Sequence, residues 1–333
     1  YVRFHGVPDV KDHSVPAVLS RFSGGAKRLD GILDSMYRYL MAYGGFEVYH
    51  YNFLDKVDNK DFIENAEALL MLANPLGATF SSLRATLFPG LLHAMSRNIA
   101  HGINDTFLFE SGYCYRSSAD EVVQDRCLSF LLSGDVVPER WREKSMHSDF
   151  FTAQGLAMRL LQTMRFTHAI RWEPKVLPGF HPGQCGCFFI ENEICAEVGT
   201  LHPHLAKKYH AQSDVQLVTL YVDKLIAFHN KHYTFQEINR KPSMRRDLSL
   251  LLPKKVSYGL LYDKILQFSP SCLKNVILFD IYSGSQVPDD FYSLSVGIIF
   301  HHESNSLTDE EVSGYMKAIL VELEKLQITV RGG

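Results

Sequence analysis

The hydrophobic positions in the first part of the chain switch repeatedly between helical and strand spacing. Helices are predicted over residues 26–43, from a cap at Ser81 through residues 86–101, and from Ser148 through Met164. Strand spacing is expected at residues 46–53, 106–116 and 128–136, and in a hairpin of residues 185–190 and 194–201. These elements predict an α+β domain, a mostly antiparallel sheet flanked by helices.

The pattern changes near residues 223–234, a polar and basic stretch that is interpreted as a linker. Domains are therefore predicted at residues 1–222 and 235–333. The second domain reads strand, helix, strand, strand, helix, strand, which is the ferredoxin-like βαββαβ order. Its elements are expected at residues 245–252, 257–268, 273–283, 291–302, 307–326 and 328–332, with a capping-box-like start at Thr308.

Composition mainly excludes a membrane-spanning chain and a strongly basic nucleic-acid-binding chain. The 333 residues are 46% hydrophobic and 21% charged, as in soluble proteins with real cores. No stretch of about 18 apolar residues predicts a membrane span. The net charge of −3 leaves any nucleic-acid contact to local clusters. The chain begins without Met or a signal-peptide pattern, which indicates a fragment of a longer protein.

The spacing of the cysteines and histidines does not favour a metal site. Six sparse cysteines are consistent with a reducing cytoplasm. Cys185, Cys187 and Cys195 lack paired zinc-knuckle spacing, so buried strand cysteines are preferred to a zinc site. The histidines at 181, 202 and 204 lie among Pro and Gly without an accompanying carboxylate motif, and turn positions are preferred.

The final hundred residues contain an ordered series of short motifs. They are Arg246-Asp247-Leu248-Ser249, Phe279-Asp280-Ile281-Tyr282-Ser283-Gly284, Ser293-Leu294-Ser295, Leu307-Thr308-Asp309-Glu310-Glu311-Val312 and Val330-Arg331-Gly332. This series resembles the ferredoxin-fold anticodon-binding domain of phenylalanyl-tRNA synthetases. Upstream, Asn74-Pro75-Leu76, Ser82-Leu83-Arg84, Phe109-Glu110-Ser111-Gly112, His181-Pro182-Gly183 and Gly199-Thr200-Leu201-His202-Pro203 resemble the bacterial-type β subunit of that synthetase. The resemblance implies a catalytic-like domain of class II synthetase fold.

Two departures from the family pattern affect site assignment. Tyr292 stands where the family usually has Lys before the Ser-Leu of the penultimate strand, so one cationic RNA contact is lost. The family's acidic magnesium ligands would lie upstream of Tyr1, and no metal is assigned to this chain.

Catalytic residues are not expected in the first domain. Class II enzymes stabilise the phosphate charge of adenylate formation with fixed guanidinium groups. In the matching strand Leu108 occupies the Arg position, and no Gly-x-Gly-x-Gly-x-x-Arg segment occurs. This chain alone is therefore predicted to be inactive and to bind no cofactor. The resemblance implies a catalytic α subunit, an α2β2 assembly that uses ATP and Mg²⁺, and work in the cytoplasm on tRNA(Phe).

The resemblance places anticodon reading on Tyr282, Ser293 and Arg331. Unpaired bases are recognised by stacking and by hydrogen bonds to their edges, which an aromatic ring, a hydroxyl and a guanidinium supply. For Tyr282 the alternative is a half-buried strand aromatic. A basic cluster of Lys241, Arg245 and Arg246 is a candidate phosphate site; the alternative is a solvated strand edge in which Asp247 pairs with one arginine.

The two apolar helices, residues 26–43 and 86–101, are candidates for the subunit interface. For the first helix the expected contacts are Leu29, Leu33, Met36 and Leu40. Two other functions stay open: a single-chain organellar-type synthetase, which would need the absent arginine signatures, and a free-standing RNA-binding or structural module.

Overall fold

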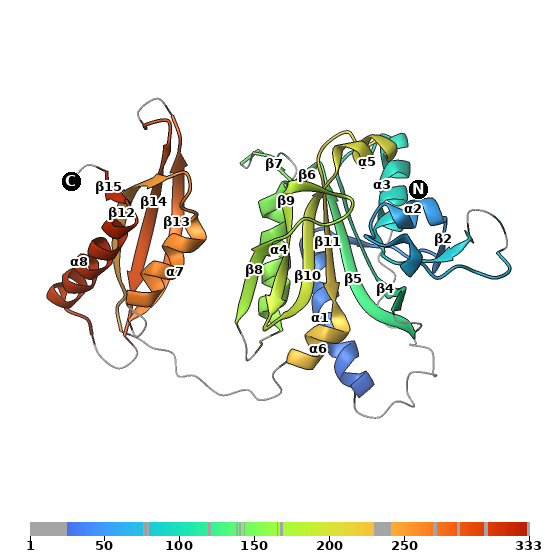
Figure 1. The fold of residues 1–333 in the computed structure, drawn as a ribbon, viewed down its shortest axis with the longest axis horizontal. Helices are drawn as coiled ribbons and strands as arrows, with labels where there is room; N and C mark the ends of the chain where they lie inside the picture. The colour runs from blue at the N-terminus through green and yellow to red at the C-terminus, as the bar shows by residue number, and fades with distance from the viewer. Residues whose placement is uncertain are drawn as a thin grey trace. The chain divides into compact units, whose positions relative to one another are not determined.

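A computed structural model describes the chain outside residues 1–24, 76, 78–79, 119–120, 138, 140, 143, 165, 167–168, 230–240, 269–271, 285–286, 303–305 and 332–333. The chain divides into two compact units, Tyr1–Tyr233 (unit 1) and Thr234–Gly333 (unit 2) (Figure 1). Each unit has its own hydrophobic core.

Unit 1 contains a seven-stranded sheet in the order β1-β4-β5-β11-β10-β9-β8. β1 is parallel to β4, and every other neighbouring pair is antiparallel. The strands of unit 1 are β1 (Phe46–Glu47), β2 (Phe53–Leu54), β3 (Ser82–Leu83), β4 (Thr106–Ser118), β5 (Glu121–Ser133), β6 (Asp135–Val137), β7 (Met146–His147), β8 (Ile170–Pro174), β9 (Phe180–Ile190), β10 (Glu193–Leu201) and β11 (Val215–Tyr221). Its helices are α1 (Gly25–Ala42), α2 (Lys56–Lys60), η2 (Ala66–Ala68), α3 (Phe88–Ala100), α4 (Phe150–Thr163), α5 (Pro203–Lys208) and α6 (Val222–Phe228).

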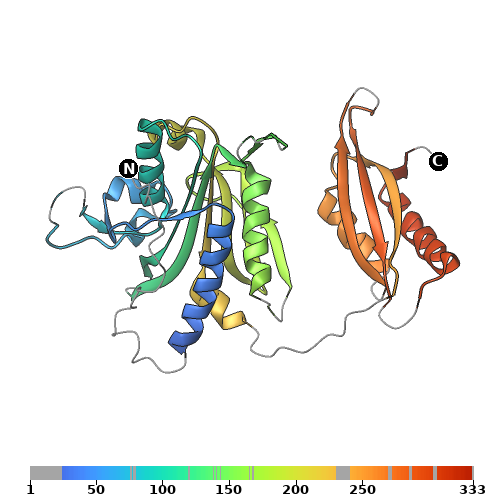
Figure 2. The same ribbon diagram turned by 180° about the vertical axis from the view of Figure 1, so that it is seen from behind.

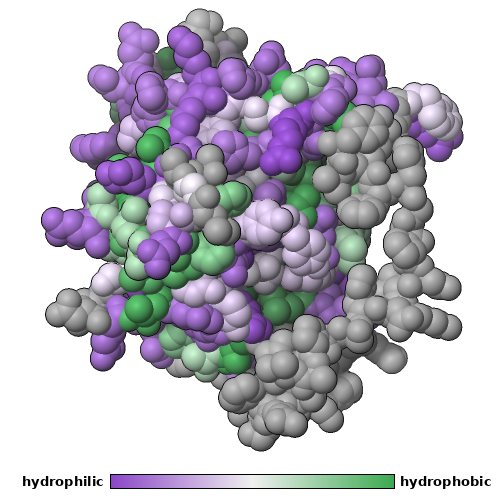
Figure 3. All heavy atoms as spheres, turned by 90° about the vertical axis from the view of Figure 1, so that its right-hand side faces the viewer, coloured by the Kyte–Doolittle hydropathy of each residue, from purple (hydrophilic) through white to green (hydrophobic). Residues whose placement is uncertain are grey.

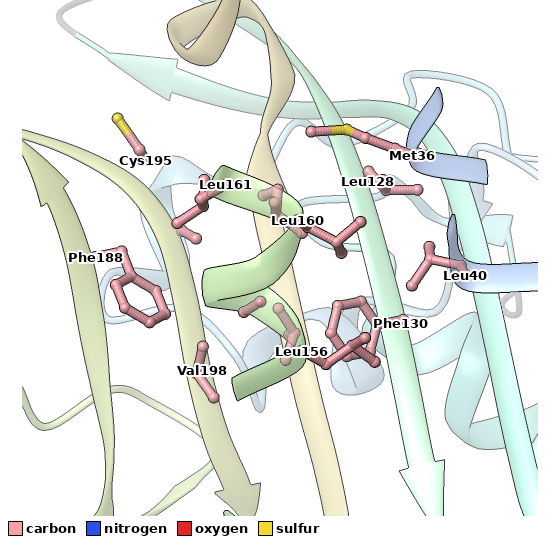
Figure 4. Packing of buried hydrophobic residues seen from close by; sticks show 14 of the residues in the cluster. Met36, Leu40, Leu128, Phe130, Leu156, Leu160, Leu161, Phe188, Cys195 and Val198 are labelled. Atoms are coloured by element: carbon pink, nitrogen blue, oxygen red, sulfur yellow. The ribbon is translucent and has the colours of Figure 1, made fainter. Parts of the chain in front are cut away.

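Helices cover both faces of this sheet. α1 and α4 lie in front of the sheet in Figure 2, and their buried side chains join strand residues in one cluster. Figure 4 shows Leu156 and Leu160 of α4 and Leu40 of α1 beside Phe130. α3 packs on the opposite face, in a second cluster. The sequence prediction of an antiparallel sheet with flanking helices is confirmed, and so is the β9–β10 hairpin.

Of the interface contacts predicted on residues 26–43, Met36 and Leu40 are wrong, because neither side chain reaches the surface of unit 1. Leu33 is partly buried and stays a prediction. Met36 and Leu40 are completely buried in the core of unit 1, and Leu33 packs against the same cluster (Figure 4). The side chain of Leu29 lies outside the described residues. The apolar stripe was identified correctly, but the unit's own sheet covers it.

The second candidate interface helix is also part of the core. α3 begins at Phe88 after Leu87, and Ser81 does not cap it. Its buried residues, among them Leu91, Leu92 and Met95, face the sheet of unit 1. Ser148 likewise does not open the third helix, because Asp149 is its N-cap and accepts a hydrogen bond from Thr152 N.

The predicted linker begins too early. Residues 222–228 form α6, in which Val222 and Leu225 are buried in the unit 1 core. The rest of the predicted linker, from residue 230, lies outside the described residues. The predicted strand at residues 46–53 is also interrupted, because only its two ends pair as β1 and β2.

Unit 2 has the predicted ferredoxin-like topology. Its elements are β12 (Met244–Pro253), α7 (Tyr258–Phe268), β13 (Leu273–Tyr282), β14 (Phe291–Phe300), α8 (Asp309–Lys325) and β15 (Thr329–Val330), and the sheet order is β13-β14-β12-β15. Thr308 and Glu311 form the capping box that starts α8. Buried residues of α7 and α8 pack with those of the strands in one cluster, on one side of the sheet.

Candidate functional site

The sheet of unit 2 has one face packed on helices and one exposed face. On β14, Leu294, Val296 and Ile298 are fully buried toward α7 and α8. The opposite face, here called the open face, carries alternate residues of the same strands. On this face of β13, two large aromatic residues are exposed, Phe279 at 52% and Tyr282 at 39%. Ile281 is also exposed, but it is paired with Leu294 and belongs to the helix side. A sheet face with exposed aromatic residues is a candidate binding surface.

Three predicted tRNA-binding residues are brought together. Tyr282 lies directly opposite Ser293 in the β13–β14 register, and the Cζ of Arg331 is 5.7 Å from the centroid of the Tyr282 ring. Arg331 N also donates to Ser249 O, which continues the β12–β15 pairing. Gly284 leaves room for the ring, since a Cβ there would lie 2.2 Å from Tyr282 Oη. The result is an exposed ring held next to a guanidinium.

Ser293 is more buried than expected for a residue that contacts RNA. It is 4% exposed and lies beneath this pair, so its hydroxyl is covered in the structure.

A second arginine–aromatic pair lies on the open face. The Cζ of Arg245 is 5.4 Å from the centroid of Phe279, and Arg245 Nε donates to Asp247 Oδ1 over 2.6 Å. The expectation that Asp247 pairs with one of the arginines is confirmed. Flat rings beside guanidinium groups are suited to stacking with bases and contacting phosphates.

The predicted basic cluster is split by the alternation of the strand. Arg246 points to the helix side, where it pairs with Asp309 in the first turn of α8. Lys241 is exposed and precedes β12. Of the three, Arg245 is the one on the open face. Tyr292, at the family's Lys position, is partly buried and donates its hydroxyl to Val256 O.

Unit 1 has a row of polar residues across the sheet face that α3 covers. Glu110 is paired with Ser129, Ser129 with Thr219, and Thr219 with Glu197, so four neighbouring strands contribute one residue each to this polar row. The hydroxyls of Ser129 and Thr219 are 2.6 Å apart. The adjacent row, Leu108, Leu131 and Leu217, is apolar.

Leu108 is the residue that the sequence resemblance places at the arginine position of class II enzymes. It is 5% exposed and belongs to the core cluster under α3. An apolar side chain in this position offers nothing to a phosphate.

Glu110, next along the same strand face, is fully engaged by its own chain. Arg84 Nη1 donates to Oε1 over 2.7 Å, and His50 Nδ1 lies 2.6 Å from Oε2. Arg84 also donates to Tyr113 O, and the bare Cα of Gly112 makes room for its guanidinium. His50 lies between β1 and β2, where the predicted strand is interrupted. Sequence reasoning did not identify this Arg84–Glu110–His50 triad, although Arg84 and Glu110 lie in the quoted motifs.

These residues do not fit ATP or Mg²⁺. Leu108 is apolar, both oxygens of Glu110 have internal partners, and Arg84 is 4% exposed, with Nε donating to Tyr113 O and Nη1 to Glu110. Within the described residues, no group of three His, Cys, Asp or Glu residues is arranged to hold a metal ion.

The histidines and cysteines have local roles. His202 is the N-cap of α5 and accepts a hydrogen bond from His204 N, and His181 accepts one from Gly183 N. The turn positions preferred from sequence are wrong for His181, which lies in β9, and for His204, which lies in α5; His202 precedes α5 as its N-cap. Burial raises the pKa of the Cys187 thiol to about 12, which keeps it protonated and a poor metal ligand.

Together, the two units define a class of protein: an α+β domain built on a large, mostly antiparallel sheet, followed by a ferredoxin-like domain with an open sheet face. Residues 16–222 match the family model described as the phenylalanyl tRNA synthetase beta chain CLM domain, and residues 239–331 match the ferredoxin-fold anticodon binding domain. The chain belongs to the phenylalanyl-tRNA synthetase β chain family.

Two relatives found by sequence agree with this assignment. The chain is 30% identical over 300 residues to the phenylalanine–tRNA ligase beta subunit of Pseudomonas fluorescens, which is 90% of this chain and 38% of that protein. It is 28% identical over 284 residues to the subunit of the same name from Staphylococcus saprophyticus, covering 85% of this chain and 35% of the relative. A pyrrolysyl tRNA synthetase structure, Desulfitobacterium hafniense PylSc, matches with a TM-score of 0.45 and 16% identity over 60% of this chain and 67% of that one.

The chain thus spans well under half the length of the relatives that it matches. Among the helices that the structure describes, none has the length and apolar character to cross a membrane.

Proposed function

We propose that this chain acts as the non-catalytic β part of a phenylalanine–tRNA ligase. Unit 2 binds the anticodon of tRNA(Phe), and unit 1 holds the catalytic α subunit in an α2β2 assembly, in the cytoplasm. The α subunit supplies the sites for ATP, Mg²⁺ and phenylalanine. The observation that carries this proposal is the open face, where Tyr282 with Arg331 and Phe279 with Arg245 form two exposed ring–guanidinium pairs.

Tyr282→Ala in the reconstituted complex tests anticodon binding. Loss of a base stack should reduce kcat/KM for tRNA by the equivalent of about 1–3 kcal/mol. Tyr282→Phe keeps the ring and should stay close to wild type. Wild-type enzyme should also distinguish tRNA(Phe) from a wobble-base variant, and Tyr282→Ala should do so less well. Undiminished discrimination by a folded Tyr282→Ala complex would show that this ring only packs the sheet.

The inactivity of the isolated chain is tested by phenylalanine-dependent pyrophosphate exchange. Since Leu108 and the internally paired Glu110 leave no phosphate site, the chain without its partner should form no adenylate. Measurable exchange would instead favour the single-chain synthetase. Association with an α subunit distinguishes the proposal from a free-standing module.

The surface that we propose for the α subunit is an exposed aromatic group near the β1 edge of the unit 1 sheet. Phe46, Tyr49 and Tyr51 are all exposed there, and Tyr51 contacts Phe80 edge to face. The side of the chain that carries α2 and α3 shows hydrophobic residues interspersed with hydrophilic ones (Figure 3). Interfaces are enriched in aromatic residues of this kind.

Tyr51→Asp and Phe151→Asp form a matched pair for this surface. The two rings are 74% and 73% exposed, but Phe151 lies on α4, away from β1. Tyr51→Asp should weaken co-purification with the α subunit, and Phe151→Asp should not. Equal association of both variants would remove the β1 edge from the interface.

A further inference from the structure

A cavity of about 370 Å³ lies on the polar face of the unit 1 sheet. This volume is in the range of small-molecule sites, roughly 300–1,000 Å³. Its floor contains Thr219 and Glu197 from the polar row, together with Tyr221. Three rings form an apolar wall: Phe62, Phe88 and Phe180, in mutual contact at centroid distances of 5.4, 5.6 and 6.3 Å.

The carboxylates at the two ends of the polar row have different partners. Glu110 at one end is closed by Arg84 and His50. Glu197 at the other end lines the cavity, and within the described part of the chain its hydrogen-bond donor is the hydroxyl of Tyr221, at 2.9 Å. Burial raises the pKa of Glu197, although the charges of Lys175, Lys224 and Arg116 partly offset it, and burial also raises the pKa of Tyr221. A carboxylate in such a place is costly without a positive partner.

Charged groups at the rim have both signs. Lys175 and Glu64 line the cavity and are exposed, and among the described residues neither forms an ion pair. Arg116 also lines it, but its guanidinium is paired with Asp125 at 3.1 Å. Lys175 is therefore the cation available to an anionic group, while Glu197 is the deeper carboxylate.

We propose that this cavity binds a small zwitterion, an amino acid with an apolar side chain. Its ammonium group would contact Glu197, its carboxylate would lie toward Lys175, and its side chain would pack against the Phe62, Phe88 and Phe180 wall. The ammonium would supply for Glu197 the positive partner that Arg84 supplies for Glu110. This site involves no phosphate and no chemistry, and it stands whether or not unit 2 binds tRNA.

Isothermal titration of the purified full chain, without an α subunit, tests the site. The probes are L-leucine, L-methionine and L-phenylalanine, the N-acetyl form of each, and isoamylamine and phenethylamine. At least one free amino acid should bind saturably. N-acetylation should abolish binding, because it removes the positive charge. Isoamylamine should bind more weakly than leucine, and phenethylamine more weakly than phenylalanine, because each amine lacks the carboxylate.

Two substitutions separate the charged contacts. Glu197→Gln should weaken the amino acid roughly 10- to 100-fold, as expected for a lost charge-assisted hydrogen bond. Lys175→Met should weaken the amino acid but leave the amine unchanged. Glu193→Gln is the matched control, because Glu193 lies on the same strand and pairs with Lys224 outside the cavity. It should bind as wild type does.

The proposal is overturned by absence of saturable binding to the wild-type chain. It is also overturned if N-acetylated probes bind equally well, or if folded Glu197→Gln retains wild-type affinity. Circular dichroism of each variant establishes folding, and Gln can still accept the Tyr221 hydrogen bond, so the substitution preserves the local contact.

Discussion

The charged residues of the two sheets differ in whether they are paired inside the protein or lie on an exposed face. In unit 1 both sheet faces are covered by helices, and Glu110 is paired inside the protein with Arg84 and His50. In unit 2 one face is covered, and arginines lie beside exposed rings on the other. The comparison shows that the presence of charged motif residues on a strand is not enough for a binding site; what matters is whether they are already satisfied by their own chain.

The largest effect is expected from a charge placed in the covered sheet of unit 1. Leu40 is fully buried while its neighbour Met41 is 52% exposed. Leu40→Asp should destabilise unit 1 by at least about 4 kcal/mol, because an unpaired carboxylate would enter the core. Met41→Asp should have little effect on urea unfolding. If Leu40→Asp stayed folded but lost only α-subunit association, the face would be an interface after all.

Removing one member of the internal triad should be the next most damaging change. Arg84→Met leaves the buried Glu110 carboxylate with His50 alone and should cost about 3–5 kcal/mol in urea unfolding. The double variant Arg84→Met with Glu110→Gln should recover part of that loss. Arg116→Met, which breaks the exposed pair with Asp125, should cost about 1 kcal/mol or less. Similar losses for Arg84→Met and Arg116→Met would contradict the triad's structural role.

Two consecutive arginines of β12 allow a test of which face of the unit 2 sheet binds tRNA. Arg245 lies on the open face and Arg246 on the helix side with Asp309. If Arg245 contacts a phosphate of the single-stranded anticodon loop, Arg245→Ala should lower the slope of log affinity against log salt by about 0.7. Arg246→Ala should leave the slope unchanged. Measuring tRNA affinity from 50 to 200 mM salt, a window in which phosphate contacts change affinity strongly, distinguishes the two; equal slopes would argue against face-specific binding.

The smallest effect concerns acid stability of unit 1. Burial alone would raise the pKa of Asp58, but hydrogen bonds from Lys208 and His93 outweigh it and hold this pKa below its usual value. The resulting stabilisation is present above the unfolded-state pKa of about 3.9 and is lost as pH falls through the lower folded-state pKa.

Asp58→Asn should therefore destabilise unit 1 at pH 6 by about 1 kcal/mol or less, and the difference from wild type should shrink toward pH 2. Hydrogen exchange of peptides from α2, α3 and α5 reports this network within the full chain. A difference that stays constant between pH 6 and pH 2 would rule out linkage to Asp58.

Sequence reasoning succeeded where a pattern reports local geometry. The strand and helix order of unit 2 and the capping box at Thr308 follow from motifs and alternation. The contact of Tyr282 with Arg331 does not, because β13 and β15 are the two edges of the four-stranded sheet and only the long side chains meet. Sequence reasoning failed where the question was what covers a surface. An apolar stripe such as that of Met36 and Leu40 has the same spacing whether a partner or the chain's own sheet packs on it.

The triad was missed for a related reason. Glu110 contacts Arg84 and His50, residues that are distant in the sequence, so only the fold brings them together. The split of Arg245 from Arg246 was in principle visible, because consecutive strand residues point to opposite faces. Reading them as one cluster ignored that alternation.

Leu108 also limits what the core of unit 1 can accept. An arginine at this position would place a guanidinium in the core under α3, beside Leu131 and Leu217. Glu110 could not offset that charge, because Arg84 and His50 already contact both of its oxygens, and the position of Arg84 depends on Gly112. The internal pairs of unit 1 therefore make its sheet tolerant of apolar replacements at Leu108 and intolerant of charged ones.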